Sequence, residues 1–321
     1  MRERPADIRD SDVADALARQ WALTVQDLSY LPVGFGGHHW LAADQTGSRW
    51  FVTVSGLASP WVPDLPGAMR TAAWLATQAG LRFVVAPVPT RAGQVVGSLD
   101  SRHALTLFPY LDAASNVGRF DDPIDDRDRA AIIDMLARMH TAVPTGIAVP
   151  AQPLELASRQ AIDQALASLG VPWTAGPYAE PGRAVLARYE RPLRQAFARF
   201  DGLLDRVRAA GGPDVITHGE LHPGNLLRTQ AGLCLIDWDV TALARPERDL
   251  WRVISGDQDA ARYSQRTGRT VSQDALALYR LRWDLDDIAG MLPKIRGSHQ
   301  QTADTLMTWT ELQKTLEAIT R

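Results

Sequence analysis

Hydrophobic and polar residues recur along the chain with two different periods. Apolar residues at helical spacing predict a helix from Ser11 to Trp21, and a second one is expected over residues 67–79. Between and after them lie short apolar runs bounded by glycine, proline and polar residues, which are typical of strands and turns. We expect such strands at 28–42 (two strands with a turn between them), 49–55, 81–87, 94–99 and 102–111.

Residues beyond about 112 are mostly helical in pattern. Ile132, Leu136, Met139 and Val143 would form one apolar helix face, so a helix is expected over 128–143. Further helices are expected over 154–169, 183–210, 272–291 and 302–320. One segment, residues 215–236, breaks this pattern with short apolar runs separated by a polar loop.

That segment predicts a strand, a polar loop and a hairpin. Gly219 and Pro223-Gly224 end the first strand, and the returning strand ends at Ile236. Glu220, Asn225 and Asp237 would then lie at neighbouring strand ends. A carboxylate can accept a hydroxyl proton, and an amide oxygen with a second carboxylate suits magnesium, which is the division of labour in phosphoryl transfer. Each residue alone is also compatible with a turn-capping role.

His218-Gly-Glu-Leu-His-Pro-Gly-Asn225, followed by Ile236-Asp-Trp-Asp239, resembles the catalytic and metal motifs of the aminoglycoside phosphotransferase and choline kinase-like family. The resemblance implies an α+β, two-lobed protein-kinase-like fold, with a small N-terminal antiparallel sheet and helix and a larger, mostly helical C-terminal lobe. Residues 1–108 would form the nucleotide-binding lobe and residues 109–321 the catalytic and acceptor-binding lobe. The family's pattern has Asp at the position of Glu220, which keeps the carboxylate and adds one methylene.

The resemblance also implies an activity and residue roles. The chain would transfer the terminal phosphoryl group of ATP or GTP, with Mg²⁺, to a hydroxyl of a small molecule. Glu220, Asn225 and Asp237 would be catalytic, with Asn225 and Asp237 as the metal ligands. The expected nucleotide contacts lie in a glycine-rich turn, whose backbone can approach phosphates closely, and in a hinge. They are Gly34, Gly36, Gly37, His38, Phe108, Tyr110 and Leu111.

Two charges typical of kinase-like sites are missing. Thr53 stands at about the place of the lysine that pairs with nucleotide phosphates, and residues 67–79 contain no Asp or Glu to partner it. We therefore expect the phosphates to be held by magnesium and by backbone N–H groups of the Gly34–Gly37 turn, with His38, His39 and Arg70 as further candidates. The same absence leaves open a second hypothesis, a pseudokinase that binds a nucleotide or small ligand without efficient catalysis.

The resemblance further implies that the acceptor binds over the second lobe. Carboxylates together with aromatic rings favour a cationic, polyhydroxylated acceptor, with an aminoglycoside-like antibiotic as the leading case. If the carboxylates of the helix over 272–291 face bulk water instead, a neutral acceptor such as a macrolide or nucleoside sugar fits equally well. The expected acceptor contacts are Asp239, Tyr279, Trp283, Asp286 and Asp287.

Composition excludes several other classes. The 321 residues carry a net charge of −3, which implies no broad affinity for nucleic acid. The sequence has neither the apolar core of a signal peptide nor an apolar run long enough to span a membrane, so a cytoplasmic location is expected. Cys234, the only cysteine, is expected to be a small buried hydrophobe, and His140 a core histidine. His218 and His222 could suggest zinc, but the preferred role for His218 is to brace the loop by hydrogen bonds.

Overall fold

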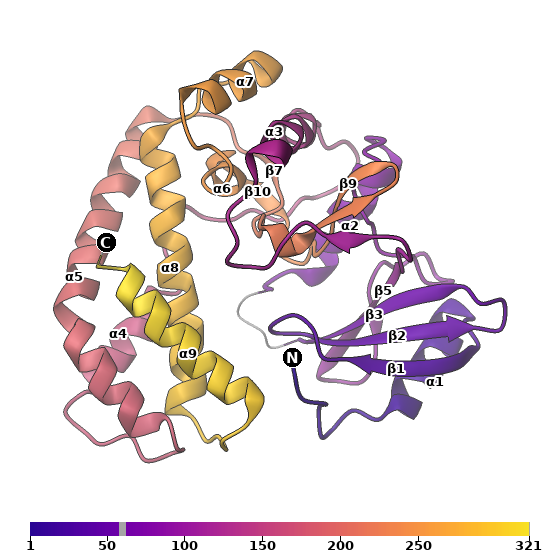
Figure 1. The fold of residues 1–321 in the computed structure, drawn as a ribbon, viewed down its shortest axis with the longest axis horizontal. Coiled ribbons are helices and arrows are strands. Elements are labelled where there is room, and N and C mark those ends of the chain that lie inside the picture. Colours follow the sequence, from indigo (N-terminus) through magenta and orange to yellow (C-terminus); the bar gives the residue numbers. More distant parts are fainter. Residues whose placement is uncertain (58–61, 321) are drawn as a thin grey trace. The chain divides into compact units, whose positions relative to one another are not determined.

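The computed structural model describes residues 1–57 and 62–320 (Figure 1). The chain folds into two compact units, which we call unit 1 (Met1–Gln152 with Asp214–Thr270) and unit 2 (Pro153–Pro213 with Val271–Arg321). Residues 109–152 and 214–270 therefore pack with the N-terminal segment. The predicted functional division at residue 108, into a nucleotide lobe and an acceptor lobe, stays a prediction.

Unit 1 contains the predicted antiparallel sheet. Its five strands have the order β1-β2-β3-β5-β4, and neighbouring strands pair antiparallel. The helix α1 (Asp10–Trp21) packs on one face, as the apolar spacing of its sequence predicts. The strands are β1 (Val25–Leu31), β2 (His38–Asp44), β3 (Arg49–Gly56), β4 (Gly97–Ser98) and β5 (His103–Pro109).

Side-chain alternation divides this sheet into a core face and a second face. Trp40, Val52 and Leu107 lie opposite one another on neighbouring strands, and all three are buried with Leu17 of α1. The Trp40 indole N–H also donates to the Asp10 carboxylate at 2.8 Å, which connects the sheet to the start of α1. The residues between these positions, including Thr53, belong to the opposite face.

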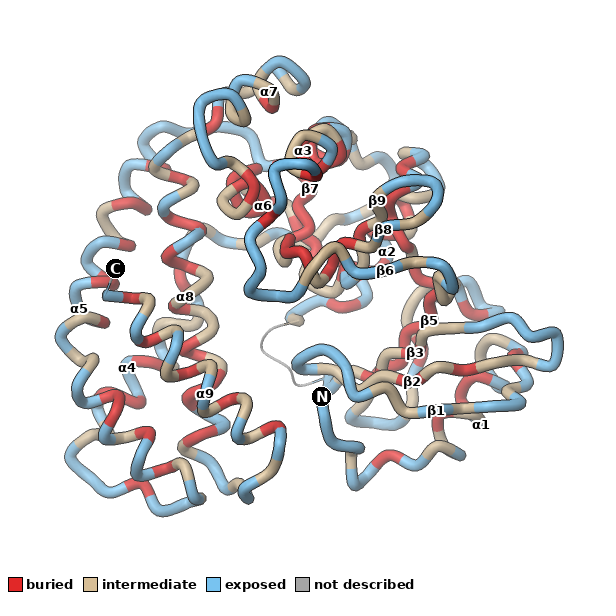
Figure 2. The backbone as a smooth tube through the Cα atoms, in the orientation of Figure 1, coloured by how far each residue is buried: buried red, intermediate tan, exposed pale blue. Residues whose placement is uncertain are grey.

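The rest of unit 1 surrounds two small strand groups. β7 pairs with β10, and β8 lies between β6 and β9, as the labels in Figure 2 show for the latter three. Their elements are β6 (Ser115–Asn116), β7 (Val215–Thr217), β8 (Leu226–Thr229), β9 (Gly232–Leu235) and β10 (Ala242–Ala244). The helices are α2 (Leu65–Thr77), α3 (Asp126–His140), α6 (Glu247–Leu250) and α7 (Asp257–Thr267), with a 3-10 turn, η1 (Pro223–Asn225).

Unit 2 is helical. α5 packs on α8, and α8 also contacts α4 and α9. Buried positions recur along α5 and α8 in Figure 2, as the spacing of Leu278, Leu281, Leu285 and Ile288 predicts. The helices are α4 (Arg159–Ala167), α5 (Ala179–Ala210), α8 (Gln273–Arg296) and α9 (Ala303–Ala318).

Some predicted elements differ in the structure. The strand expected over 81–87 is irregular backbone with one isolated bridge, Val84 to Leu235, because the Leu235 backbone hydrogen-bonds to Phe83 and Val85. The strand expected over 94–99 shortens to β4. The helix expected from 154 begins at Arg159, and α7 has no counterpart among the predictions, since Tyr263 is its one buried residue.

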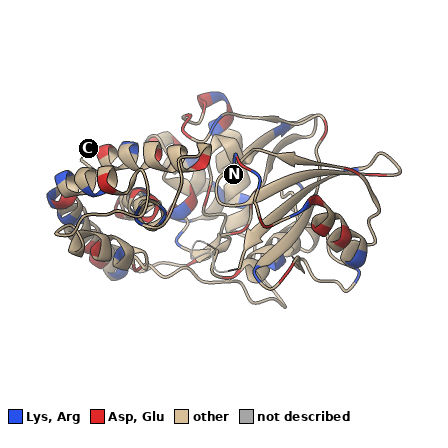
Figure 3. Ribbon diagram, turned by 90° about the horizontal axis from the view of Figure 1, so that it is seen from below, with Lys and Arg blue, Asp and Glu red and all other residues tan. Residues whose placement is uncertain are grey.

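Charged residues are interspersed along the helices of both units, acidic with basic (Figure 3). Among the described residues, no helix combines the length and the apolar character that crossing a membrane requires.

Candidate active site

The loop after β7 holds the first of the predicted catalytic residues. The strand ends at Thr217, and Gly219 adopts φ +94°, a conformation that glycine tolerates best. A Cβ at Gly219 would overlap the Arg248 guanidinium, so the loop backbone packs directly on that side chain. Glu220 follows at once, and η1 then brings the chain to Asn225 at the start of β8.

Hydrogen bonds join Asn225 to Glu220 and to Ile236, the residue before Asp237. The Asn225 side-chain amide donates to the Glu220 carbonyl at 3.0 Å, and the Ile236 N–H donates to the Asn225 carbonyl at 3.0 Å. Asp237 directly follows Ile236, so this backbone hydrogen bond holds Asp237 close to Asn225. The structure thus brings Glu220, Asn225 and Asp237 together, as the motif predicts.

Asp237 itself has an uncommon backbone conformation. Its φ is +69°, and in the described part of the chain Ala22 is the other non-glycine residue with positive φ. Trp238, fully buried beside it, donates its indole N–H to the Leu235 carbonyl at 3.0 Å and contacts the His218 ring edge-on. Asp237 as a residue is exposed, although protein atoms crowd around its carboxylate and partly shield it from water.

The site carries an excess of negative charge. Burial and the neighbouring Asp237 raise the pKa of Glu220 to about 7, and burial raises the pKa of Asp237 to about 6. Burial and the charges of Asp237 and Glu220 also raise the pKa of Asp239 well above its usual range. Arg248 acts in the opposite direction on Glu220 and Asp239. Three carboxylates that repel one another form a place where a cation would be stabilised.

Arg248 is a buried cation within hydrogen-bonding distance of the loop. It is 7% exposed, and its guanidinium donates to the Thr217 hydroxyl and to the Val240 carbonyl, both at 2.9 Å. These contacts fix the charge beside the carboxylates. The sequence pattern gave Arg248 no role, because 28 positions separate it from Glu220 in sequence.

His218 braces the loop, as expected. Its Nε2 donates to the Ile236 carbonyl at 2.8 Å, and its Nδ1 accepts from the Glu220 N–H at 3.2 Å. Burial lowers the pKa of His218 to about 4, which keeps the ring neutral and able to serve both partners. Both ring nitrogens are thus used within the loop.

The Asp249 carboxylate holds the same loop through hydrogen bonds from its backbone N–H groups. It accepts from the N–H groups of His218 (2.8 Å) and Gly219 (2.7 Å), and from His140 at 3.1 Å. Burial alone would raise the pKa of Asp249, but the hydrogen bond from His140 and the nearby Arg248 charge hold it below the usual value. His140 also contacts the Tyr263 hydroxyl at 2.9 Å, so the expectation of a satisfied core histidine is confirmed.

The predicted nucleotide contacts lie in the same unit. Gly34 and Gly36 have φ of +71° and +100°, as expected for a tight turn. His38, however, lies on the core face, where its Nδ1 contacts the Tyr30 hydroxyl at 3.0 Å. His39 points to the other face with Thr53. The nucleotide contact expected at His38 stays a prediction.

The predicted hinge leaves the sheet at the end of β5. Phe108 pairs with Phe51 of β3, and the Tyr110 N–H donates to the Arg49 carbonyl at 3.1 Å. The Arg49 guanidinium lies over the Tyr110 ring at 4.8 Å, and the Leu111 carbonyl accepts from Ala114. Because the Tyr110 N–H is already bonded to Arg49, a nucleotide base bound along this segment would have to pair with other backbone groups.

The predicted acceptor residues are divided between the units. Asp239 belongs to unit 1, whereas the other four are on α8 of unit 2. Asp286 accepts from the Ser158 hydroxyl and from Arg282, and Tyr279 is 3% exposed. Both therefore have structural contacts within unit 2, and Trp283 and Asp287 are half-buried. A role of this set in acceptor binding stays a prediction.

The donor set fits magnesium. Asn225 and Asp237 offer an amide oxygen and a carboxylate, which are hard ligands, and the repelling carboxylates nearby favour a divalent cation. Among the described residues, no group of three or more His, Cys, Asp or Glu side chains could hold a metal by itself. Two protein ligands completed by nucleotide phosphates and water are the usual arrangement for magnesium.

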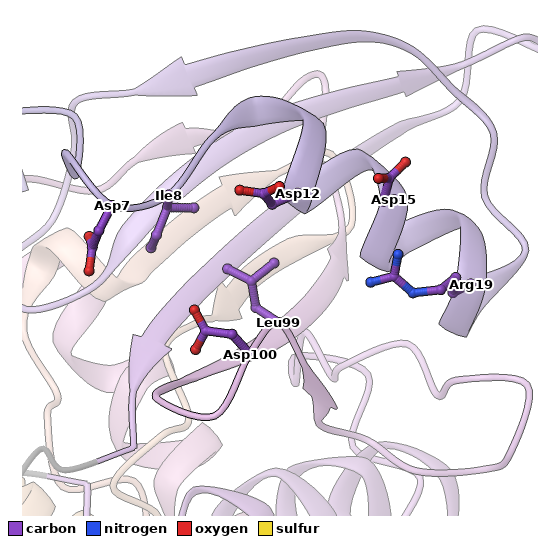
Figure 4. A pocket seen from close by; sticks show the side chains of 7 residues that line it. All are labelled: Asp7, Ile8, Asp12, Asp15, Arg19, Leu99 and Asp100. Atoms are coloured by element: carbon purple, nitrogen blue, oxygen red, sulfur yellow. The ribbon is translucent and has the colours of Figure 1, made fainter.

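A hollow beside α1 offers a second cluster of carboxylates (Figure 4). Three of its carboxylates already have partners outside the lining: Asp7 pairs with Arg102, Asp12 pairs with Arg9, and Asp100 hydrogen-bonds with His103. It is therefore a set of surface ion pairs and hydrogen bonds. Figure 4 labels the residues that line it: Asp7, Ile8, Asp12, Asp15, Arg19, Leu99 and Asp100.

The chain as a whole is similar to several known proteins. Among curated proteins, protein StrN of Streptomyces griseus is 28% identical over 263 residues, which cover 78% of this chain and 76% of that protein. Spectinomycin phosphotransferase APH(9)-Ia, solved in complex with ADP and spectinomycin, superposes with a TM-score of 0.74 at 15% identity and covers 98% of both chains.

Choline kinase LicA from Streptococcus pneumoniae superposes with a TM-score of 0.60 at 15% identity, covering 96% of this chain and 99% of that one. These similarities confirm the α+β, two-lobed protein-kinase-like fold. The model of the phosphotransferase enzyme family matches residues 27–291. Because that match spans most of the sequence, the chain belongs to the phosphotransferase enzyme family.

Proposed function

We propose that this protein transfers the terminal phosphoryl group of ATP or GTP, in the presence of magnesium, to a hydroxyl of a small molecule. The observation that carries the proposal is the hydrogen-bonded grouping of Glu220 and Asn225 in one loop, directly beside Asp237. Family membership supports phosphoryl transfer in general, while the roles of these residues and of magnesium are our inference.

Each residue has a separate task in this proposal. The Glu220 carboxylate orients the acceptor hydroxyl and accepts its proton as the oxygen attacks the phosphorus and the bond to the leaving diphosphate breaks. A pKa of about 7 leaves part of Glu220 ionised near neutral pH, as a proton acceptor requires. Asn225 and Asp237 would hold magnesium, which neutralises charge on the phosphate oxygens.

The acceptor is proposed to be small, polyhydroxylated and cationic, with an aminoglycoside-like antibiotic as the leading case. Glu220, Asp237 and Asp239 give the site a negative charge that favours ammonium groups. Two proteins of the same fold are described as kinases of spectinomycin and of choline, and choline is a quaternary ammonium compound. We further infer that the protein acts in the cytoplasm and that such an activity would confer antibiotic resistance.

A phosphoryl-transfer assay with ATP and GTP and a panel of cationic and neutral hydroxylated compounds tests the proposal. We expect transfer to a cationic acceptor, and we expect Asp237→Ala to reduce kcat more than Glu220→Ala, since positioning and charge neutralisation supply most of the rate. Loss of one transition-state charge contact corresponds to about a hundredfold or more in kcat. Glu220→Asp tests whether the additional methylene is required.

Three outcomes would contradict the proposal. Unchanged activity in both alanine variants would remove this site from the reaction, and transfer restricted to neutral acceptors would contradict the acceptor class. A protein that binds nucleotide but phosphorylates nothing in the panel would support the pseudokinase, which Thr53 in place of the usual lysine specifically favours.

A further inference from the structure

A polar row crosses the face of the five-stranded sheet opposite α1. His39 of β2 lies opposite Thr53 of β3, and Thr53 lies opposite Thr106 of β5. The neighbouring positions, Trp40 and Val52, belong to the apolar core. The proposed nucleotide side of unit 1 thus presents uncharged hydrogen-bonding side chains where kinase-like proteins carry a lysine.

His39 and Thr53 form a direct pair. The His39 Nδ1 lies 3.1 Å from the Thr53 hydroxyl, and the His39 ring packs on Phe51 with 5.0 Å between ring centres. Burial lowers the pKa of His39 to about 3, so the ring is neutral near pH 7 and carries one N–H. If Thr53 donates to Nδ1, the N–H is on Nε2. If Nδ1 donates to Thr53, the hydroxyl hydrogen is directed to another acceptor.

The glycine-rich turn folds against this pair. A Cβ added at Gly34 would lie 2.9 Å from the His39 Nε2, and one at Gly37 would lie 3.3 Å from the Thr53 methyl group and 3.4 Å from the His39 ring. The turn can approach this closely only because both positions lack a side chain. The Nε2 edge of His39 therefore lies next to the turn that is expected to cover the phosphates.

We propose that His39 and Thr53 together are a neutral phosphate anchor that takes the place of the missing lysine and its acidic partner. In either tautomer, the pair has one hydrogen available for an acceptor outside it. The proposal rests on the proposed function, since it needs a nucleotide at this face. It also explains why α2 can lack an acidic residue. A lysine at this place would need a carboxylate to pair with its charge, whereas an uncharged anchor does not.

Calorimetry on the full chain tests the anchor without any chemical step. The probes are magnesium with ADP or GDP, whichever binds the wild type more tightly, and the corresponding nucleoside without phosphates. His39→Phe keeps a ring on Phe51 but removes the donor, and Thr53→Val keeps the shape without the hydroxyl. His39→Gln restores an N–H, and His103→Gln, at the start of β5 where the histidine bonds Asp100, is the matched control.

We expect each of the first two variants to weaken diphosphate binding about tenfold or more, the usual effect of losing a hydrogen bond to a charged group. Nucleoside binding should stay within about twofold, His39→Gln should recover part of the loss, and His103→Gln should match the wild type. If the pair only supported the sheet, its loss would weaken nucleoside binding as well, so unchanged nucleoside affinity distinguishes a phosphate anchor from a structural role.

Equal losses for nucleoside and diphosphate would show that the pair only supports the sheet, which overturns the proposal. Wild-type affinity for the diphosphate in His39→Phe and Thr53→Val would also overturn it, and would leave the proposed function standing. A wild-type protein that binds no nucleotide would refute the proposed function and this inference together.

Discussion

At the scale of single residues, the candidate site combines a strong carboxylate cluster with few cations. Burial raises the pKa of Glu220, Asp237 and Asp239, the charge of Asp237 adds to the rise at Glu220 and Asp239, and Arg248 opposes it at those two residues. Three backbone or side-chain hydrogen bonds to Asp249 fix the loop that carries Glu220. The additional methylene of Glu220 therefore extends from a backbone that is held in place, which favours a working base over a displaced one.

His222, in the same loop, gives a test at this scale. The residue is 8% exposed, its Nδ1 has no hydrogen-bond partner among the residues that the structure describes, and its ring packs edge-on against Phe120 at 4.7 Å. Burial and the charge of Arg252 lower the pKa of His222 to about 3. The unfolded chain binds a proton at this residue below about pH 6.5, whereas the folded chain does not, so wild-type stability is lost as pH falls from that value.

His222→Phe removes this proton uptake and keeps the aromatic contact. We expect the variant to gain stability relative to the wild type between about pH 7.5 and about pH 5, by at most about 2 kcal/mol, since each pH unit between the two pKa values contributes about 1.4 kcal/mol. Urea unfolding at both pH values measures the difference. A stability difference that does not change with pH would show that His222 titrates normally in the folded protein.

At the scale of elements, unit 2 depends on close packing between α5 and α8. A Cβ at Gly182 of α5 would lie 2.5 Å from a methyl group of Ile295 on α8, and Ile295 is 1% exposed. A Cβ at Gly202, in the same helix, would lie 3.7 Å from an Arg206 nitrogen, which is ordinary contact distance. The two glycines therefore serve different purposes in one helix.

Gly182→Ala and Gly202→Ala should change stability in opposite directions. Alanine is favoured over glycine in a helix by about 1 kcal/mol, so Gly202→Ala should stabilise unit 2 by up to that amount. At Gly182 the same gain is exceeded by overpacking, which destabilises by about 1–3 kcal/mol. Thermal unfolding of both variants, compared with the wild type, measures the two stability changes. Stabilisation by Gly182→Ala equal to that of Gly202→Ala would mean that the helices are not closely packed there.

Sequence patterns predicted some elements well and missed others for physical reasons. The grouping of Glu220, Asn225 and Asp237 was predictable because the loop and hairpin are local in sequence. Residues 81–87 have the apolar composition of a strand. The backbone groups of Phe83 and Val85, however, hydrogen-bond to Leu235, which is outside the five-stranded sheet.

Other features depend on contacts between distant residues or on register. α7 buries Tyr263 alone, so its sequence has no apolar stripe to detect. Choosing between His38 and His39 required the strand register, because a shift of one residue moves a side chain to the other face. Cys234 is half-buried rather than fully buried, although burial raises the pKa of its thiol, since its position in a short hairpin leaves one side open.

At the scale of the whole molecule, the predicted nucleotide and catalytic residues all belong to unit 1. They come from sequence segments 34–38, 108–111 and 220–237, and the first two are separated from the third by unit 2 in sequence. Unit 1 is thus completed only when the chain returns from unit 2 at Asp214. We propose that magnesium and neutral donors, rather than a lysine, bind the nucleotide phosphates in this unit.

The measurement that tests this account most directly is calorimetry of ATP and GTP binding to the wild type and to Asp237→Asn, each with magnesium and with a chelator. Because Thr53 replaces the cationic anchor, removing magnesium should weaken wild-type binding by more than about 1.4 kcal/mol, which is tenfold in Kd. Asp237→Asn should lose most of that magnesium dependence. Tight nucleotide binding that is equal with and without magnesium would contradict the account.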